Sequence, residues 1–236
     1  KGNTQIALIL ASLIISNIVV LVVSQGQLRV GFYSKTCPNA ESIIRKVVQK
    51  AVADNPRNAA ILLRLHFHDC FVQGRDGSIL IRNYEDDELK AQGNLGVVSF
   101  DIIDSAKARL ENLCPGIVSC ADIVSLAARD AVNGPFYDVP TGRRDGRVSK
   151  MSLAANLPDV DDSINVLKSK FNEKGLSDKD LVTYIGATAC FFMQKRLYNL
   201  TPGGGSDPAI IPGFLPQLKD KCPFNGDVNV RIPLDS

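Results

Sequence analysis

Residues 64–80 read RLHFHDCFVQGRDGSIL and contain both histidines of the chain, His66 and His68. On a helix Arg64 and His68 lie four residues apart and share one face, whereas His66 points elsewhere. An imidazole transfers protons in both directions near neutral pH, and a guanidinium stabilises a developing negative oxygen. The pair suits cleavage of an O–O bond. The same spacing also fits two polar filler histidines and a surface arginine.

The second half of this stretch is rich in oxygen ligands. Asp69, Asp76 and Ser78 are interleaved with glycines that let the backbone turn inward. Carboxylate, hydroxyl and carbonyl oxygens are the ligands of a hard cation such as calcium. The spacing differs from that of the EF-hand loop, and a solvated turn is the alternative interpretation.

Apolar residues recur at intervals of three and four through much of the chain. This spacing predicts amphipathic helices, which we place at residues 43–52, 60–71, 100–113, 121–132, 166–171 and 181–185. Ser119 and Asp122 occupy capping-box positions before one of them. Alternating strand patterns are scarce, and the pattern therefore predicts a mainly α fold with long loops.

Composition excludes several classes of protein. The 236 residues carry 27 basic and 25 acidic side chains, a formal charge of +2, which gives no strong attraction to nucleic acid. A 45% hydrophobic and 22% charged composition is typical of a folded globule rather than a disordered chain. Aromatic residues make up 6% and tryptophan is absent, which argues against an aromatic stacking surface for sugars or bases.

The N-terminus carries an uncharged run, Ile6–Val23, followed by Ser24-Gln25-Gly26. We interpret residues 1–26 as a secretory signal peptide and residues 27–236 as one domain. The alternative is a membrane anchor, because the run approaches the ~20 residues that span a bilayer. Secretion favours disulfides for the six cysteines, and spacing alone leaves fifteen pairings open.

Several further motifs occur in one order along the chain. They are FYSKTCPNAESI (32–43), CPGIVSCADIVSLAARDAV (114–132), PTGRRDGR (140–147), ANLP (155–158), RLYNL (196–200) and LKDKCP (218–223). Together with residues 64–80, they resemble the plant secretory (class III) haem peroxidases over nearly everything after Gln27. The resemblance implies a haem-peroxidase-like helical fold with haem b and calcium as cofactors.

The resemblance also assigns roles to single residues. It makes His68 the distal acid–base catalyst, Arg64 its cationic partner and Asn94 the residue that orients the imidazole. The implied calcium ligands are the side chains of Asp69, Asp76 and Ser78 and the carbonyls of Val72 and Gly74, with Glu88 as an outer-shell acid. Pro158 matches a residue at the edge where aromatic substrates bind. The implied disulfides are Cys37–Cys114 and Cys190–Cys222.

The activity implied is reduction of hydrogen peroxide followed by one-electron oxidation of small phenolic donors. The enzyme would be a monomer secreted to the extracellular space, cell wall or vacuole. It would have no nucleic-acid partner and no stable membrane association after signal cleavage.

The sequence departs from the family pattern on the opposite side of the haem. The segment Asp180–Cys190 is shorter than the pattern and lacks its Gly-His-Thr core, so no proximal histidine is present. Either that bond to iron is lost, or Met193, Cys190, Tyr184 or a water replaces it. We expect haem affinity and turnover far below those of the family. The alternative function is a catalytically impaired or inactive secreted fragment that still binds calcium.

The sequence also stops before the end of the family domain. We therefore expect an incomplete fold, with the distal part and a fraction of the proximal part. Asp235 matches one ligand of a second calcium site whose other ligands are not among the 236 residues. Cys70 faces Arg75 where the family has a partner cysteine, and Cys120 lacks its partner as well.

Overall fold

The structure is a computed structural model that describes residues 28–83, 85–132, 136–159, 161–184, 187–201, 203–226 and 231–233. The signal segment expected at residues 1–26 and the expected calcium ligand Asp235 lie outside these ranges. The chain forms two compact units, Lys1–Asn156 and Leu157–Ser236.

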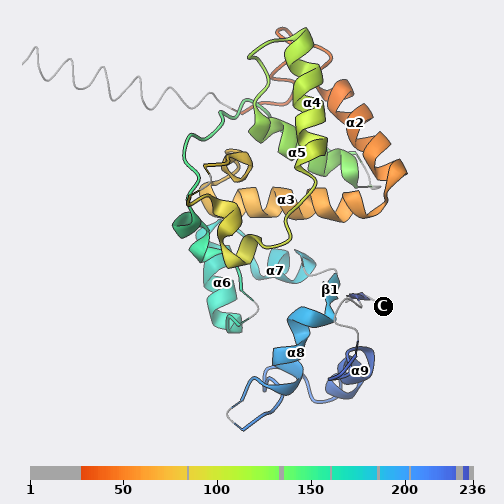
Figure 1. Cartoon of the computed structure of the whole chain (residues 1–236), viewed down its shortest axis with the longest axis vertical. Helices are drawn as coiled ribbons and strands as arrows, with labels where there is room; N and C mark the ends of the chain where they lie inside the picture. Colours follow the sequence, from red (N-terminus) through yellow and green to blue (C-terminus); the bar gives the residue numbers. More distant parts are fainter. Residues whose placement is uncertain are drawn as a thin grey trace, which may run out of the picture. The chain divides into compact units, whose positions relative to one another are not determined.

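The described helices of the first unit are α2 (Ala40–Asp54), α3 (Arg57–Gln73), α4 (Phe100–Leu113) and α5 (Cys120–Ala131). Helix α5 packs against α2, α3 and α4, and α3 runs at a steep angle to α4 (Figure 1). Because its neighbours cover it, α5 is buried along nearly all of its length. It begins at the Ser119 cap, whose Oγ accepts a hydrogen bond from the Asp122 backbone N–H at 3.2 Å.

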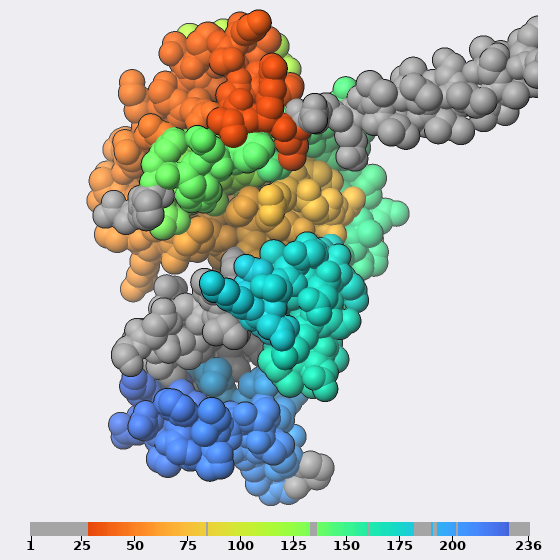
Figure 2. All heavy atoms as spheres, turned by 180° about the vertical axis from the view of Figure 1, so that it is seen from behind, coloured from red at the N-terminus to blue at the C-terminus, as the bar shows by residue number. Residues whose placement is uncertain are grey.

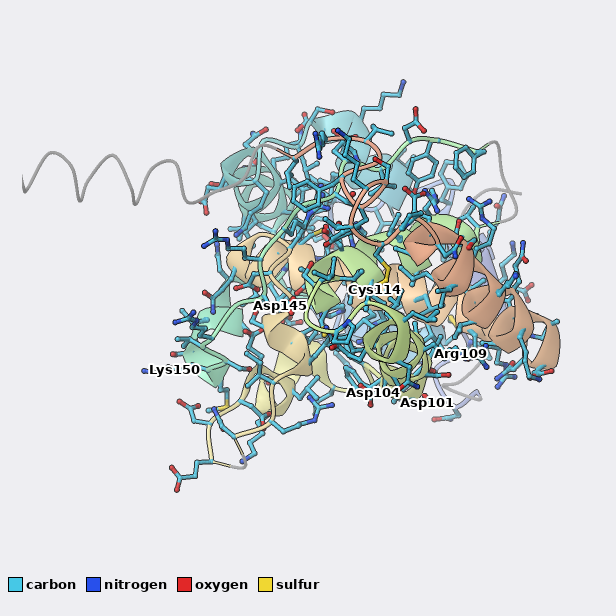
Figure 3. The ribbon with its side chains drawn as sticks, turned by 90° about the horizontal axis from the view of Figure 1, so that it is seen from above. Asp101, Asp104, Arg109, Cys114, Asp145 and Lys150 are labelled. Carbon is cyan, nitrogen blue, oxygen red and sulfur yellow. A yellow bond between two sulfur atoms is a disulfide. The ribbon has the colours of Figure 1, made fainter. Side chains whose placement is uncertain are left out.

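The core of the first unit consists of aliphatic side chains from these helices. The largest fully buried ones include Ile44, Leu62, Leu65, Ile103, Leu110, Ile123 and Leu126. Helix α4 buries one face here, while Asp101, Asp104 and Arg109 project from its exposed side (Figure 3). Burial of this apolar face is the main force that holds the helices together.

The segment before α2 is held to the core by covalent and polar contacts. A disulfide joins Cys37 to Cys114 at the end of α4 (Figure 3). The Tyr33 hydroxyl donates to Asp122 Oδ2 at 2.6 Å, and Asp122 also pairs with Arg143 at 2.8 Å. Residues 28–39, which precede α2, and α5 accordingly lie against each other in the space-filling view (Figure 2).

Short 3₁₀ helices join the longer ones and carry several polar side chains of interest. In the first unit they are Ser78–Leu80, Glu88–Lys90, Gln92–Asn94 and Met151–Asn156. The first three follow α3 along the chain, so that Ser78, Glu88 and Asn94 lie buried near the end of that helix.

The second unit is described by helices α6 (Ile164–Glu173), α7 (Asp178–Tyr184), α8 (Cys190–Tyr198) and α9 (Leu215–Lys221). Strand β1 (Ala187–Ala189) pairs antiparallel with β2 (Arg231–Pro233), with Thr188 opposite Ile232. A disulfide between Cys190 and Cys222 and the buried Leu197 form a small core between α8 and α9.

The mainly helical fold expected from the sequence is confirmed. The six predicted helical segments correspond to α2 to α7, with ends that differ by up to a few residues. Helices α8 and α9 and the short strand pair were not predicted, because their short stretches show no clear period. Within the described ranges, no helix has both the length and the apolar character of a membrane span.

Candidate functional site

Helix α3 positions the residues that the sequence singled out. Leu62, Leu65 and Phe71 anchor it in the core, and Arg64 and His68 follow each other along another face. The Arg64 Nε–H donates to His68 Nε2 at 3.2 Å. The side chain of His68 is itself buried. The two side chains are therefore neighbours on one face of the helix, as their spacing predicted.

The hydrogen bonds of His68 determine its tautomer. A guanidinium is only a donor, so His68 Nε2 must be the unprotonated nitrogen that accepts from Arg64. His68 Nδ1 lies 2.6 Å from Asn94 Oδ1 and donates its proton to that oxygen. The Asn94 amide is fixed in turn, because its Nδ2 donates to the Glu88 carbonyl at 2.7 Å. His68 thus presents a basic Nε2 and a protonated Nδ1.

The surroundings keep this imidazole neutral. Burial, and after it the positive charge of Arg64, lowers the pKa of His68 to about 4. At neutral pH the side chain is therefore an unprotonated base, ready to accept a proton at Nε2.

Helix α3 ends in a loop that turns its oxygens inward. Gly74 adopts the left-handed conformation with φ 83°, and its N–H and that of Arg75 both donate to the Asp69 carbonyl. Asp69 Oδ1 accepts from the Gly77 backbone N–H at 2.8 Å. Gly77 also has a positive φ, and a Cβ there would lie 3.1 Å from the Ala121 backbone nitrogen. The loop is therefore packed against the start of α5.

Four buried side-chain oxygens around this loop have no hydrogen-bond partner among the described residues. They are Asp69 Oδ2, Ser78 Oγ and both carboxylate oxygens of Glu88. Burial, with the Asp76 carboxylate as the second cause, raises the pKa of Asp69 to about 7. Burial is also the largest cause that raises the pKa of Glu88. Such groups are costly in the interior unless a counter-charge compensates them.

These oxygens fit a calcium ion. The expected carbonyl ligands of Val72 and Gly74 belong to the last turn and the cap of α3. The described residues contain no group of three or more His, Cys, Asp or Glu side chains arranged as a metal site. A cation here would therefore depend on the Ser78 hydroxyl and main-chain carbonyls as well as on carboxylates, which is the donor set that calcium accepts.

Glu88 connects the oxygen cluster to the histidine. Its carboxylate belongs to the cluster, its carbonyl accepts from Asn94, and its backbone N–H donates to Ser149 Oγ at 3.0 Å. The role of Ser149 was not predicted, since a single serine 61 residues away carries no signal in the sequence.

His66 lies apart from the His68 site. Its Nε2 is 3.6 Å from Cys70 Sγ, and that sulfur accepts a hydrogen bond from Arg75 Nε at 3.0 Å. Cys70 and Cys120 are free thiols, and burial raises the pKa of both. Both disulfides that the resemblance implies, Cys37–Cys114 and Cys190–Cys222, are present.

Pro158, expected at the edge where aromatic substrates bind, is half-buried in the second unit, and Asp235, expected at a second calcium site, lies outside the described residues. Two backbone groups that sequence reasoning missed do belong to the site of Arg64 and His68. The Leu95 and Gly96 carbonyls accept from Arg64 Nη2 and Nη1 at 2.8 and 3.0 Å.

Comparison with known proteins identifies the class. The family model described as "Peroxidase" matches residues 44–236. The chain belongs to the peroxidase family, and its relatives are plant enzymes.

The chain is 60% identical to Peroxidase 43 and 61% identical to Peroxidase 13, both of Arabidopsis thaliana. Each alignment covers 90% of this chain and 68% of the relative. Identity to Peroxidase N1 of Nicotiana tabacum is 47%, over 98% of this chain and 72% of that protein. The comparisons support peroxidase function and do not favour an impaired fragment over the enzyme.

Membership of the family implies a haem cofactor, and the residues fit it on one side only. Arg64, His68 and Asn94 fit the side where peroxide is handled. The 236 residues contain only two histidines, His66 and His68, and both lie on α3, so neither can bind the iron from the opposite side. Of the possible substitutes, Cys190 is bound in a disulfide and Met193 packs against the small core of the second unit. The side chain of Tyr184 is not among those that the structure describes.

Proposed function

We propose that this protein is a secreted haem peroxidase that reduces hydrogen peroxide and oxidises small phenolic donors in one-electron steps. The observation that carries the proposal is His68, which is held neutral with a basic Nε2 and sits beside the cationic Arg64. Membership of the peroxidase family supports the same reaction.

The roles of the side chains follow from their chemistry. His68 Nε2 takes a proton from the peroxide, and the resulting imidazolium returns it to the departing oxygen. Arg64 stabilises the negative charge that develops as the O–O bond breaks. Asn94 acts through His68, because its Oδ1 holds the proton on Nδ1. Haem would supply the redox chemistry when bound, and the roles of these side chains concern the proton and the developing charge.

The proposal includes calcium as a structural ion. Asp69, Asp76 and Ser78 would supply side-chain oxygens, and Val72 and Gly74 carbonyls, with Glu88 as the outer acid. The ion would compensate the buried negative charge and fix the end of α3, which carries His68 one residue before Asp69.

The proposal has three further parts. The haem is haem b, the protein is secreted, and it is a monomer. Two disulfides support an oxidising compartment such as the extracellular space, cell wall or vacuole. A formal charge of +2 supports the absence of a nucleic-acid partner. Residues 27–236 would form the mature peroxidase domain without stable membrane association.

One observation favours a second candidate, a catalytically impaired fragment that binds calcium. The 236 residues contain no third histidine to hold the iron from the opposite side. On this candidate the oxygen cluster would bind calcium normally, while haem affinity and turnover would fall far below those of the family.

Reconstitution distinguishes the two candidates. The calcium-loaded full chain is titrated with haem b and followed by visible absorption, and peroxide-dependent oxidation of a phenol is then measured. The enzyme predicts turnover that falls by about 10²–10⁴-fold in His68→Leu, the usual value of a general acid–base. His66→Leu, on the same helix, is the matched control and should retain activity. A protein that folds and binds calcium but shows no turnover above free haem would refute the proposal in favour of the fragment.

A further inference from the structure

The guanidinium of Arg64 is held by three acceptors at once. Its Nε donates to His68 Nε2 at 3.2 Å, its Nη2 to the Leu95 carbonyl at 2.8 Å and its Nη1 to the Gly96 carbonyl at 3.0 Å. All of these bonds are to protein atoms. The two carbonyls belong to a turn that directly follows Asn94.

The first of these bonds occupies the nitrogen that the proposed reaction needs. A neutral imidazole has one lone pair, at the nitrogen without a proton, and in His68 that nitrogen is Nε2. A lone pair that accepts from Arg64 cannot at the same time accept fully from a peroxide. The side chain of Arg64 therefore competes with the substrate for the base.

We propose that the Leu95–Gly96 turn is a positioning element that holds Arg64 across His68 Nε2 in the substrate-free protein, and that peroxide must displace this contact before His68 accepts its proton. The inference rests on the proposed function, because it concerns the order of events at the same site. Gly96 is the positioning residue, since it acts through Arg64.

The turn is built to aim its carbonyls. Gly96 has φ +77°, a conformation that a residue with a side chain rarely adopts, and a Cβ there would lie 3.4 Å from Arg64 Nη1. The Val97 backbone N–H donates to the Asn94 carbonyl at 3.1 Å. Asn94 thereby fixes the turn with its backbone and His68 with its side chain. The Leu95 side chain is 63% exposed, so its carbonyl rather than its packing contributes here.

The contact at Nε2 is tested by nuclear magnetic resonance on the full chain without haem. Because the chain has only two histidines, labelling with ¹⁵N-histidine gives four ring nitrogens, which His66→Gln assigns. Replacing Arg64 with Leu removes the donor and should move the His68 Nε2 resonance downfield, while Nδ1 stays protonated. An unchanged Nε2 resonance in Arg64→Leu would overturn the inference.

The role of the turn is tested by the access of a reagent to Nε2. Diethyl pyrocarbonate modifies unprotonated imidazole nitrogens, and mass spectrometry reports its rate at His68, with His66 as the internal reference. We expect Gly96→Ala to raise the His68 rate about fivefold, the factor that one lost hydrogen bond is worth. Gly116→Ala is the matched control, because Gly116 has φ +70° and no atom within 4 Å of an added Cβ.

The outcomes distinguish the role of the Leu95–Gly96 turn from the proposed peroxidase function. Equal rates at His68 in Gly96→Ala and Gly116→Ala would overturn the role of the turn, and the Arg64→Leu spectrum remains decisive if Gly96→Ala does not fold. These measurements need neither haem nor turnover. Absence of peroxidase activity with the Nε2 contact intact would refute the proposed function alone.

Discussion

The proposed calcium ion should stabilise the protein, because it would compensate side-chain oxygens that are buried without a partner. Asp69 Oδ2, Ser78 Oγ and the two carboxylate oxygens of Glu88 are buried without a hydrogen-bond partner among the described residues. Each unsatisfied buried group costs about 1–3 kcal/mol, and charged groups cost more. A bound cation would satisfy the Asp69 and Ser78 oxygens directly and would compensate the nearby Glu88 carboxylate by its charge, so the ion-free protein should be the less stable form.

The size of the effect follows from linkage. Calcium at 100 times its Kd adds about 2.7 kcal/mol to the free energy of unfolding. For a chain of this size 1 kcal/mol moves Tm by about 2–4 °C, so Tm should rise by roughly 5–11 °C. Thermal unfolding by circular dichroism, with chelator or with added calcium, measures this. Magnesium at the same concentration should give a smaller shift, because it demands shorter, octahedral coordination.

Substitution of Glu88 gives a sharper form of the prediction. Glu88→Gln removes a buried charge, so it should raise Tm in chelator and reduce the response to calcium. Glu85→Gln is the matched control, since Glu85 lies three residues earlier and is exposed. A Tm that is the same in chelator and in calcium, for the wild type and for both variants, would contradict the cation site.

Three further predictions concern pH and hydrogen bonding. Burial raises the pKa of Asp69 from 3.8 to about 7, so the folded calcium-free chain holds a proton that the unfolded chain releases. The stability of the calcium-free protein therefore falls as pH rises from 3.8 through 7. The difference in Tm between calcium-loaded and chelated protein should widen between pH 5 and 8, and a constant difference would contradict this prediction. Asn94→Ala removes the acceptor of the His68 Nδ1 proton, so ¹⁵N spectra should show both tautomers of His68 and turnover should fall by roughly 10–100-fold. A single, unchanged His68 tautomer would exclude Asn94 as the residue that fixes it. Burial, and after it the hydrogen bond to Asp122, raises the pKa of Tyr33 to about 12, so Tyr33→Phe should cost about 1–3 kcal/mol in urea unfolding at neutral pH. The variant should also lose less stability than the wild type as pH rises from 10 through 12, because Tyr33 no longer contributes to that loss. An alkaline loss of the same size in the variant and the wild type would disprove this assignment.

The sequence predicted the long helices because each has an apolar face of regular period. Arg64 and His68 could be paired from their spacing alone, since neighbours on a helix face are fixed by helix geometry. Helices α8 and α9 escaped prediction because their nine and seven residues show no clear apolar period.

The rest of the site depends on contacts between distant segments. Asn94 lies 26 residues after His68 and has no local pattern that points to it, so only the family resemblance suggested its role. The Leu95 and Gly96 carbonyls were invisible for another reason, since every residue has a carbonyl and only the backbone conformation aims it. The buried oxygens of Asp69 and Glu88 likewise become unusual only once burial is known.

The three bonding groups of Glu88 have a consequence for anyone who redesigns this protein. The side chain of Glu88 would serve the proposed ion, and its main-chain carbonyl accepts from the Asn94 amide, which in turn accepts from His68. Substitutions that shift the Glu88 backbone would alter calcium binding and the orientation of His68 together, whereas substitutions of Ser78 would alter calcium binding alone. To change calcium binding without changing the basicity of His68, substitutions should therefore begin at Ser78 and leave Glu88 in place.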